Sequence, residues 1–100
     1  MDNHFLSTLG LARRAGKLLL GVDSVREYRK SAALLIYASD ASPRVERVLA
    51  DRKDPAIRPE LTKKELGSAV GCKEAAVIAV TDAGFAGIIR KKFESQEDNA

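Results

Sequence analysis

The sequence predicts a single α/β domain, a three-layer α/β/α sandwich in which helices cover both faces of a small mixed four-stranded sheet. Three observations indicate this fold class. The chain has 100 residues, which is the length of one domain. Short apolar runs of strand length alternate with stretches in which apolar residues recur at helical spacing. Hydrophobic residues make up 45% and charged residues 31%, which is a globular rather than a disordered composition.

The first half of the chain predicts two helices and two strands. Residues 4–15 carry one apolar face and are followed by Gly16, so they predict a helix. Residues 17–20 are a short apolar run, which is typical of a strand. Residues 22–32 predict a second helix with a buried stripe and a basic outer face. The continuous apolar run LLIYA at 34–38 predicts a strand that is covered on both faces.

The middle of the chain predicts one helix and one weak strand. Ser42 and Pro43 favour a helix start, with serine as the cap and proline at the first helical position. Residues 54–61 contain two prolines, which cannot donate a backbone hydrogen bond to a neighbouring strand. We therefore expect only a short edge strand around Ile57.

The last part of the chain predicts a capped helix, a buried strand and a final helix. The residues TKKE at 62–65 form a capping-box pattern that starts a helix. The apolar run at 75–80 predicts a second strongly buried strand, and residues 83–92 predict a helix. We expect one domain over residues 1–93 and a flexible polar tail at 94–100.

Positive charge is concentrated in the first half of the chain. Residues 1–53 hold ten Lys or Arg and six Asp or Glu, a balance of +4, whereas residues 54–100 hold seven and eight, a balance of −1. A basic face attracts phosphate backbones, but moderate positive charge also aids solubility. Charge alone therefore leaves a nucleic-acid partner and a merely solvated surface equally open.

The sequence indicates a reducing compartment and no membrane insertion. Cys72 is the one cysteine, so no disulfide can form within the chain. No apolar run approaches the roughly 20 residues that cross a bilayer. The first positive charges follow the first apolar stretch, the reverse of the order in a secretory signal. We expect a cytoplasmic protein.

No set of residues predicts catalysis. A nucleophile pair would need Cys72 and the one histidine, His4, to meet with an orienting third group. One cysteine and one histidine do not supply the usual ligands of a zinc site. Gly16 and Gly21 form no nucleotide-binding glycine pattern. We expect neither an enzyme nor a bound metal or cofactor.

Two aspartates follow predicted strands and precede predicted helices. In α/β folds, polar residues at the carboxyl ends of strands often line a site, so Asp40 and Asp82 are candidates. Aspartate also caps helices and stabilises their first turn. We favour the capping interpretation for both.

The remaining candidate site is the start of the second helix. The strand at 17–20 ends at Gly21 and the helix begins at once, so unpaired backbone N–H groups are expected there. The basic residues expected around it are Lys17, Arg26, Arg29 and Lys30. The residues permit RNA binding here, or an ordinary connection beside a solvated basic helix.

Four segments carry a family resemblance. Residues 16–21 read GKLLLG, and residues 62–71 read TKKELGSAVG. These look like the GKxxxG and KEELGxAxG segments of the ribosomal protein L-seven-Ae / L-thirty-e superfamily, which binds kink-turn RNA. Residues 9–17 (LGLARRAGK) and 76–86 (AVIAVTDAGFA) are similar to its bacterial YlxQ-like branch. The resemblance covers about residues 5–92 and implies the same α/β/α sandwich.

The resemblance also implies an RNA site. In the superfamily this site combines the start of the helix after GKxxxG, which reads guanine edges of sheared pairs, with the loop after ELGxAxG, which makes apolar contacts to nucleotides. The matching residues here are Gly21, Asp23, Ser24 and Glu27, with Cys72, Lys73, Glu74 and Ala75 in the loop. We expect phosphate contacts from Arg13, Arg14, Lys17, Arg26 and Lys73. We expect base or sugar contacts from Gly21, Asp23 and Ser24.

The chain departs from the superfamily's pattern inside that site. Asp23 and Ser24 stand where kink-turn binders carry Asn-Glu, and Glu27 replaces a lysine. Lys73 and Glu74 replace apolar loop residues. An aspartate accepts a hydrogen bond from a base amino group but cannot donate one. The first hypothesis is a non-catalytic protein that binds structured, kink-turn-like or ribosomal RNA in translation or ribosome function. The alternative is a protein-interaction module that keeps the fold without RNA.

Overall fold

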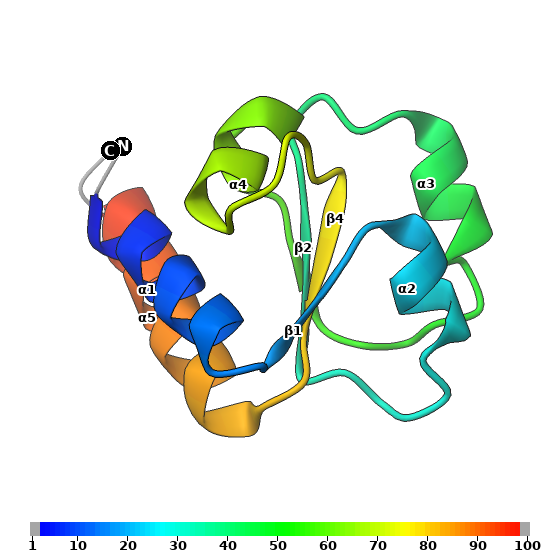
Figure 1. The fold of residues 1–100 in the computed structure, drawn as a ribbon, viewed down its shortest axis with the longest axis horizontal. Helices are drawn as coiled ribbons and strands as arrows, with labels where there is room; N and C mark the ends of the chain where they lie inside the picture. Colours follow the sequence, from blue (N-terminus) through cyan, green and yellow to red (C-terminus); the bar gives the residue numbers. More distant parts are fainter. Residues whose placement is uncertain (1–2, 99–100) are drawn as a thin grey trace.

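The computed structural model describes residues 3–98, which form five helices and four strands in alternating order (Figure 1). The helices of this range are α1 Asn3–Arg14, α2 Val22–Glu27, α3 Pro43–Val48, α4 Lys63–Ala69 and α5 Ala83–Asp98. The strands are β1 Leu18–Leu20, β2 Leu34–Tyr37, β3 Ala56–Ile57 and β4 Val77–Val80. Each element lies where the sequence predicts one.

The four strands form one mixed sheet in the order β1-β4-β2-β3. β4 runs antiparallel to both of its neighbours, so that Leu18 and Leu34 both pair with Val80. β3 runs parallel to β2 at the far edge. The last strand in the sequence therefore occupies an inner position, and its first residue lies beside the end of β1.

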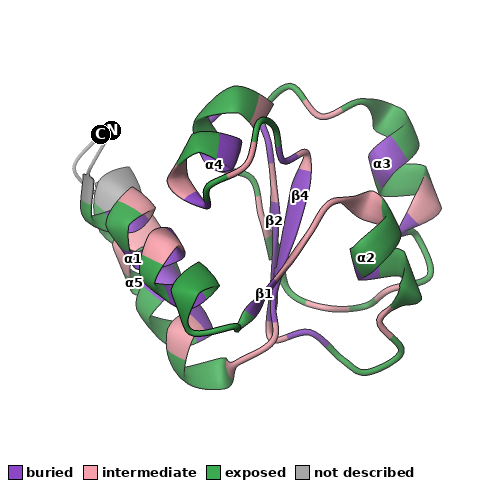
Figure 2. Ribbon diagram, viewed as in Figure 1, coloured by how far each residue is buried: buried purple, intermediate pink, exposed green. Residues whose placement is uncertain are grey.

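The side chains of the inner strands alternate between two cores. Ile78 and Val80 pack with residues of α1, α4 and α5, whereas Val77 and Ala79 pack with residues of α2 and α3. Figures 1 and 2 show the sheet between these two groups of helices, with β4 buried along its length. The predicted three-layer α/β/α sandwich is confirmed.

The second helix is shorter than expected. The sequence predicts it over 22–32, but α2 ends at Glu27 and Tyr28 has an extended backbone with φ −75° and ψ 111°. The carbonyl oxygens of Tyr28 and Lys30 accept hydrogen bonds from the guanidinium of Arg52 instead of continuing the helix. A long-range contact therefore overrides a local helical pattern.

The last helix is longer than expected. The sequence predicts it over 83–92, but α5 runs to Asp98 and so includes most of the expected polar tail at 94–100. Residues 99 and 100 lie outside the described residues. The flexibility of this tail stays a prediction.

Polar side chains cap two of the helices as expected. Ser42 and Pro43 stand at the expected start of α3, but the side chain of Ser42 makes no capping hydrogen bond. Thr62 and the glutamate three residues later form the predicted capping box of α4. Asp82 Oδ2 accepts the N–H of Phe85 at 2.9 Å and so caps α5. Asp40 accepts the N–H of Lys63 at 2.8 Å, and therefore stabilises the start of α4 rather than the helix that follows it in sequence.

Two further observations concern the described residues as a whole. None of their helices combines the length and apolar character that a bilayer crossing requires. Within the same range, no three side chains of histidine, cysteine, aspartate or glutamate gather closely enough to hold a metal ion.

Candidate nucleic-acid interface

The start of α2 and the loop before β4 lie at the same end of the sheet, where β1 ends and β4 begins. The N–H of Gly21 donates to the carbonyl oxygen of Val77 at 3.0 Å. Because β4 begins at Val77, this bond places residues 72–75 at the edge where α2 starts (Figure 1). We call residues 21–24 together with 72–75 the candidate edge. The structure thus brings together the two segments that the resemblance selects.

The first turn of α2 exposes backbone donors. Gly21 precedes it with φ 89° and ψ 158°, a conformation open almost only to glycine, and makes no side-chain cap. Within the described residues, the N–H groups of Val22, Asp23 and Ser24 have no hydrogen-bond partner. Unpaired N–H groups of this kind bind phosphate oxygens and other anions.

Two backbone hydrogen bonds to helix α4 position the loop 72–75. The N–H of Cys72 donates to the carbonyl oxygen of Gly67 at 2.8 Å, and the N–H of Ala75 donates to that of Lys63 at 3.0 Å. A Cβ atom on Gly67 would lie 2.8 Å from the Cα of Glu74, closer than side chains allow. Gly67 is therefore a positioning residue that the sequence analysis did not select, although it lies inside the ELGxAxG segment.

The loop presents fewer side chains than the resemblance implies. Ala75 is only 2% exposed and belongs to the core beneath the sheet, so its side chain does not reach the surface. Cys72 is half-buried, and its Sγ donates to the carbonyl oxygen of Glu74 at 3.4 Å. Lys73 and Glu74 are exposed. The accessible part of the loop is therefore charged rather than apolar.

The helix contributes both signs of charge to the candidate edge. Arg26 and Asp23 form an ion pair at 3.6 Å, with side chains 56% and 81% exposed. A pair so open to water is weak, so both groups stay available to a ligand. Ser24 and Glu27 are also exposed.

Three of the expected phosphate contacts lie at the opposite end of β1. The carbonyl oxygen of Lys17 accepts the N–H of Thr81, which follows β4, whereas Gly21 pairs with the start of β4. The three residues of β1 separate Lys17 from Gly21, and the four residue steps between them span about 13 Å. Arg13 and Arg14 end α1 next to Lys17. The structure therefore does not bring these cations to the candidate edge.

One cation that the sequence analysis did not select lies near the candidate edge. Arg58 follows β3, stacks 5.3 Å from the ring of Tyr37, donates to the carbonyl oxygen of Ala38 and pairs with Glu46. Tyr37 itself pairs with Val77 in the sheet. Burial raises the pKa of the Tyr37 hydroxyl, and the charge of Arg58 acts in the opposite direction. Arg58 lies in a proline-containing segment that carries no recognisable motif, so the sequence gave no signal for it.

Comparison with known proteins identifies the family. No protein-family model matches this chain. The chain is 38% identical over 84 residues to the RNA-binding protein YlxQ of Bacillus subtilis (strain 168), which covers 78% of this chain and 83% of that protein. The chain belongs to the YlxQ family. This agrees with the resemblance to the bacterial YlxQ-like branch found in the sequence.

Solved structures have the same fold as this YlxQ-family chain. A protein of unknown function from Bacillus halodurans C superposes with a TM-score of 0.81 at 30% identity, covering 93% of this chain and 99% of that one. The Giardia lamblia 15.5kD RNA binding protein superposes with a TM-score of 0.66 at 20% identity, covering 90% of this chain and 84% of that one. The second similarity concerns the fold alone.

Proposed function

We propose that this YlxQ-family chain is a non-catalytic RNA-binding protein that holds structured RNA at the candidate edge. The observation that carries the proposal is the Gly21–Val77 hydrogen bond, which joins the exposed donors of α2 and the loop 72–75 into one surface. The Bacillus subtilis relative, which is named an RNA-binding protein, supports it. Kink-turn-like or ribosomal RNA, bound in the cytoplasm during translation, is the partner we propose.

Each part of the candidate edge has a distinct role in this proposal. The free N–H groups at the start of α2 bind acceptor atoms of phosphates or bases. Asp23 accepts from the amino group of guanine or cytosine, which gives sequence preference. Lys73 and Arg26 contact phosphates, which give affinity and position. Arg13, Arg14 and Lys17 contribute long-range attraction, which salt screens beyond about 8 to 10 Å.

Binding of a fluorescent kink-turn hairpin, measured by anisotropy over a series of salt concentrations, tests the proposal. We expect the affinity to fall steeply with salt, with a slope of about 0.7 to 0.9 per phosphate contacted. Lys73→Ala is expected to reduce that slope by about 0.7 to 0.9, the contribution of one phosphate contact. Lys91→Ala, which removes the same charge from the exposed surface of α5, is the matched control. Salt-independent or undetectable binding would contradict the proposal.

The exposed carboxylates of Glu27 and Glu74 favour one alternative function. Both would repel a phosphate backbone, whereas a basic protein partner would pair with them. In that case a pull-down with the tagged chain would retain a specific protein after nuclease treatment. The double variant Glu27→Gln with Glu74→Gln would no longer retain that protein. If the same double substitution instead strengthens RNA binding, the RNA proposal is favoured.

A further inference from the structure

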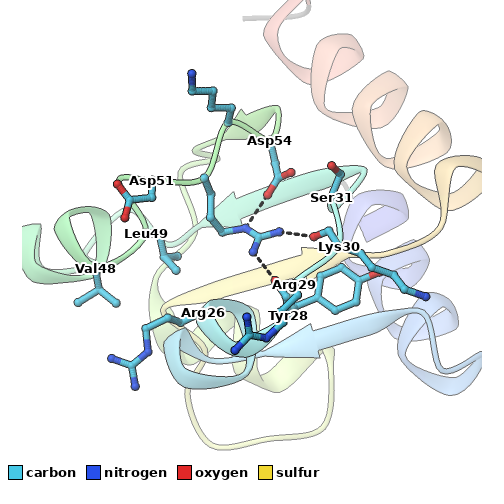
Figure 3. A pocket seen from close by; sticks show the side chains of 11 residues that line it. Arg26, Tyr28, Arg29, Lys30, Ser31, Val48, Leu49, Asp51 and Asp54 are labelled. Atoms are coloured by element: carbon cyan, nitrogen blue, oxygen red, sulfur yellow. Dashed lines mark hydrogen bonds and ion pairs between the residues drawn. The ribbon is translucent and has the colours of Figure 1, made fainter.

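A pocket of about 450 Å³ lies at the far end of α2 from the candidate edge (Figure 3). Its lining comes from residues 26–31 and 48–54, two segments that the fold brings together. We propose that this pocket is a second phosphate-binding site, which holds the backbone of the same RNA a few nucleotides beyond the candidate edge. This inference rests on the proposed function.

Arg52 and Asp54 build the frame of the pocket. Nε of Arg52 donates to Oδ2 of Asp54 at 2.6 Å, and its two Nη atoms donate to the carbonyl oxygens of Tyr28 at 2.6 Å and Lys30 at 2.7 Å. Oδ1 of Asp54 accepts the N–H of Ala32 at 3.0 Å. The two side chains are only 15% and 7% exposed. They balance each other's charge and hold the segment after α2, so neither is the group that binds the ligand.

The rim of the pocket carries basic side chains that are not paired with the carboxylate of Asp54. Arg29, Lys30 and Lys53 are exposed, and in the described part of the chain none of them has an acidic partner. The lining adds one further carboxylate, Asp51. Over the same range, the backbone N–H groups of Arg29, Lys30 and Ser31 also lack a hydrogen-bond partner. Excess positive charge beside free donors suits a phosphate group.

Arg26 connects the pocket to the candidate edge. It lines the pocket, and its guanidinium also lies 3.6 Å from the carboxylate of Asp23 in the first turn of α2. Figure 3 shows Arg26 and Arg29 along the α2 side of the pocket. The six residues of α2 span about 9 Å, and one nucleic-acid strand carries a charge about every 3.4 Å of axis. A strand that contacts Ser24 and runs along α2 would therefore reach the pocket within about two or three nucleotides.

The test compares two double variants of the full chain with the same kink-turn hairpin. Arg29→Ala with Lys53→Ala removes two cations from the rim and leaves Arg52 and Asp54 intact. Because two phosphate contacts are lost, we expect the salt slope to fall by about 1.5 and the affinity to fall roughly tenfold at low salt. Arg90→Ala with Lys91→Ala removes the same charge from α5 in the other helical layer, and is expected to leave the slope unchanged. Circular dichroism checks that both variants are folded.

The outcomes separate this inference from the proposed function. If the native chain binds the hairpin and both double variants lose the same affinity, the pocket is not a phosphate site, while RNA binding at the candidate edge stands. If the native chain does not bind the hairpin, both proposals fail. A titration with inorganic phosphate, followed through the amide signals of Arg29 and Ser31, identifies a site for free anions. Saturation there, together with hairpin binding that the rim variant does not weaken, would also overturn the inference.

Discussion

Arg52 shows how one side chain can serve structure although its sequence context suggests surface charge. Its guanidinium joins the end of α2, the segment after it and Asp54. Arg52→Ala leaves the nearly buried carboxylate of Asp54 without its charged partner and the carbonyl groups of Tyr28 and Lys30 without a donor, so we expect a loss of about 3 kcal/mol in the free energy of unfolding. Urea denaturation measures it. Arg52→Lys keeps the charge but not the planar fork, so we expect its free energy of unfolding to lie between those of the native chain and of Arg52→Ala. Equal stability of all three chains would refute this role.

Gly21 is the residue whose backbone conformation shapes the candidate edge. At φ 89° any other residue is strained, although a Cβ there would meet nothing within 4 Å. Gly21→Ala is therefore expected to lower the free energy of unfolding by about 1 to 3 kcal/mol and to weaken hairpin binding. Gly87→Ala is the matched control, because it lies in α5 with equal free space and should stabilise the chain by about 0.5 to 1 kcal/mol. Thermal unfolding of both variants measures the contrast, and a stabilised Gly21→Ala chain would refute the argument.

Between elements, the contact of α4 with the loop 72–75 decides where the loop's charges point. A methyl group on Gly67 would overlap the backbone of Cys72 and Glu74, so the loop must move to admit it. We expect Gly67→Ala to shift the amide signals of residues 72–75 and to weaken hairpin binding at least severalfold. Ser68→Ala, at the next and exposed position of α4, should change neither. Unshifted loop signals in Gly67→Ala would show that the loop does not depend on this contact.

The elements themselves could be predicted because each has a local pattern. The runs at 34–38 and 75–80 are apolar throughout, and TKKE carries its own capping chemistry. The end of α2 could not be predicted, because residues 28–32 keep a helical pattern while Arg52, more than twenty positions away, takes up their carbonyl groups. Asp40 is a similar case, because its capped N–H belongs to Lys63.

Across the whole molecule, the distribution of charge depends on topology that the sequence does not display. The two segments of the candidate edge were selected by family resemblance, and the sheet places them together through Gly21 and Val77. The cations Lys17 and Arg26 look like neighbours in the sequence, yet β1 carries the chain from one end of the sheet to the other between them. Spacing along a chain gives no distance once a strand intervenes.

This distribution predicts unequal effects of removing basic residues. Arg13 and Arg14 lie about a strand's length from the candidate edge, so Arg13→Ala with Arg14→Ala should lower hairpin affinity less than twofold near physiological salt, where charges this distant are largely screened. Anisotropy titrations of this variant and of Lys73→Ala provide the comparison. A larger loss from the α1 pair than from Lys73→Ala would move the RNA site to the other end of the sheet.

The inner position of β4 has a consequence for synthesis of the chain. β1 and β2 both need β4 as their antiparallel partner, and β4 spans residues 77–80. A nascent chain therefore cannot assemble its sheet until residues 77–80 have emerged. In the meantime β1 has no partner in the sheet, and β2 has only the two-residue strand β3. A fragment that stops before Val77 is accordingly expected to unfold without a cooperative transition, whereas the complete chain shows one.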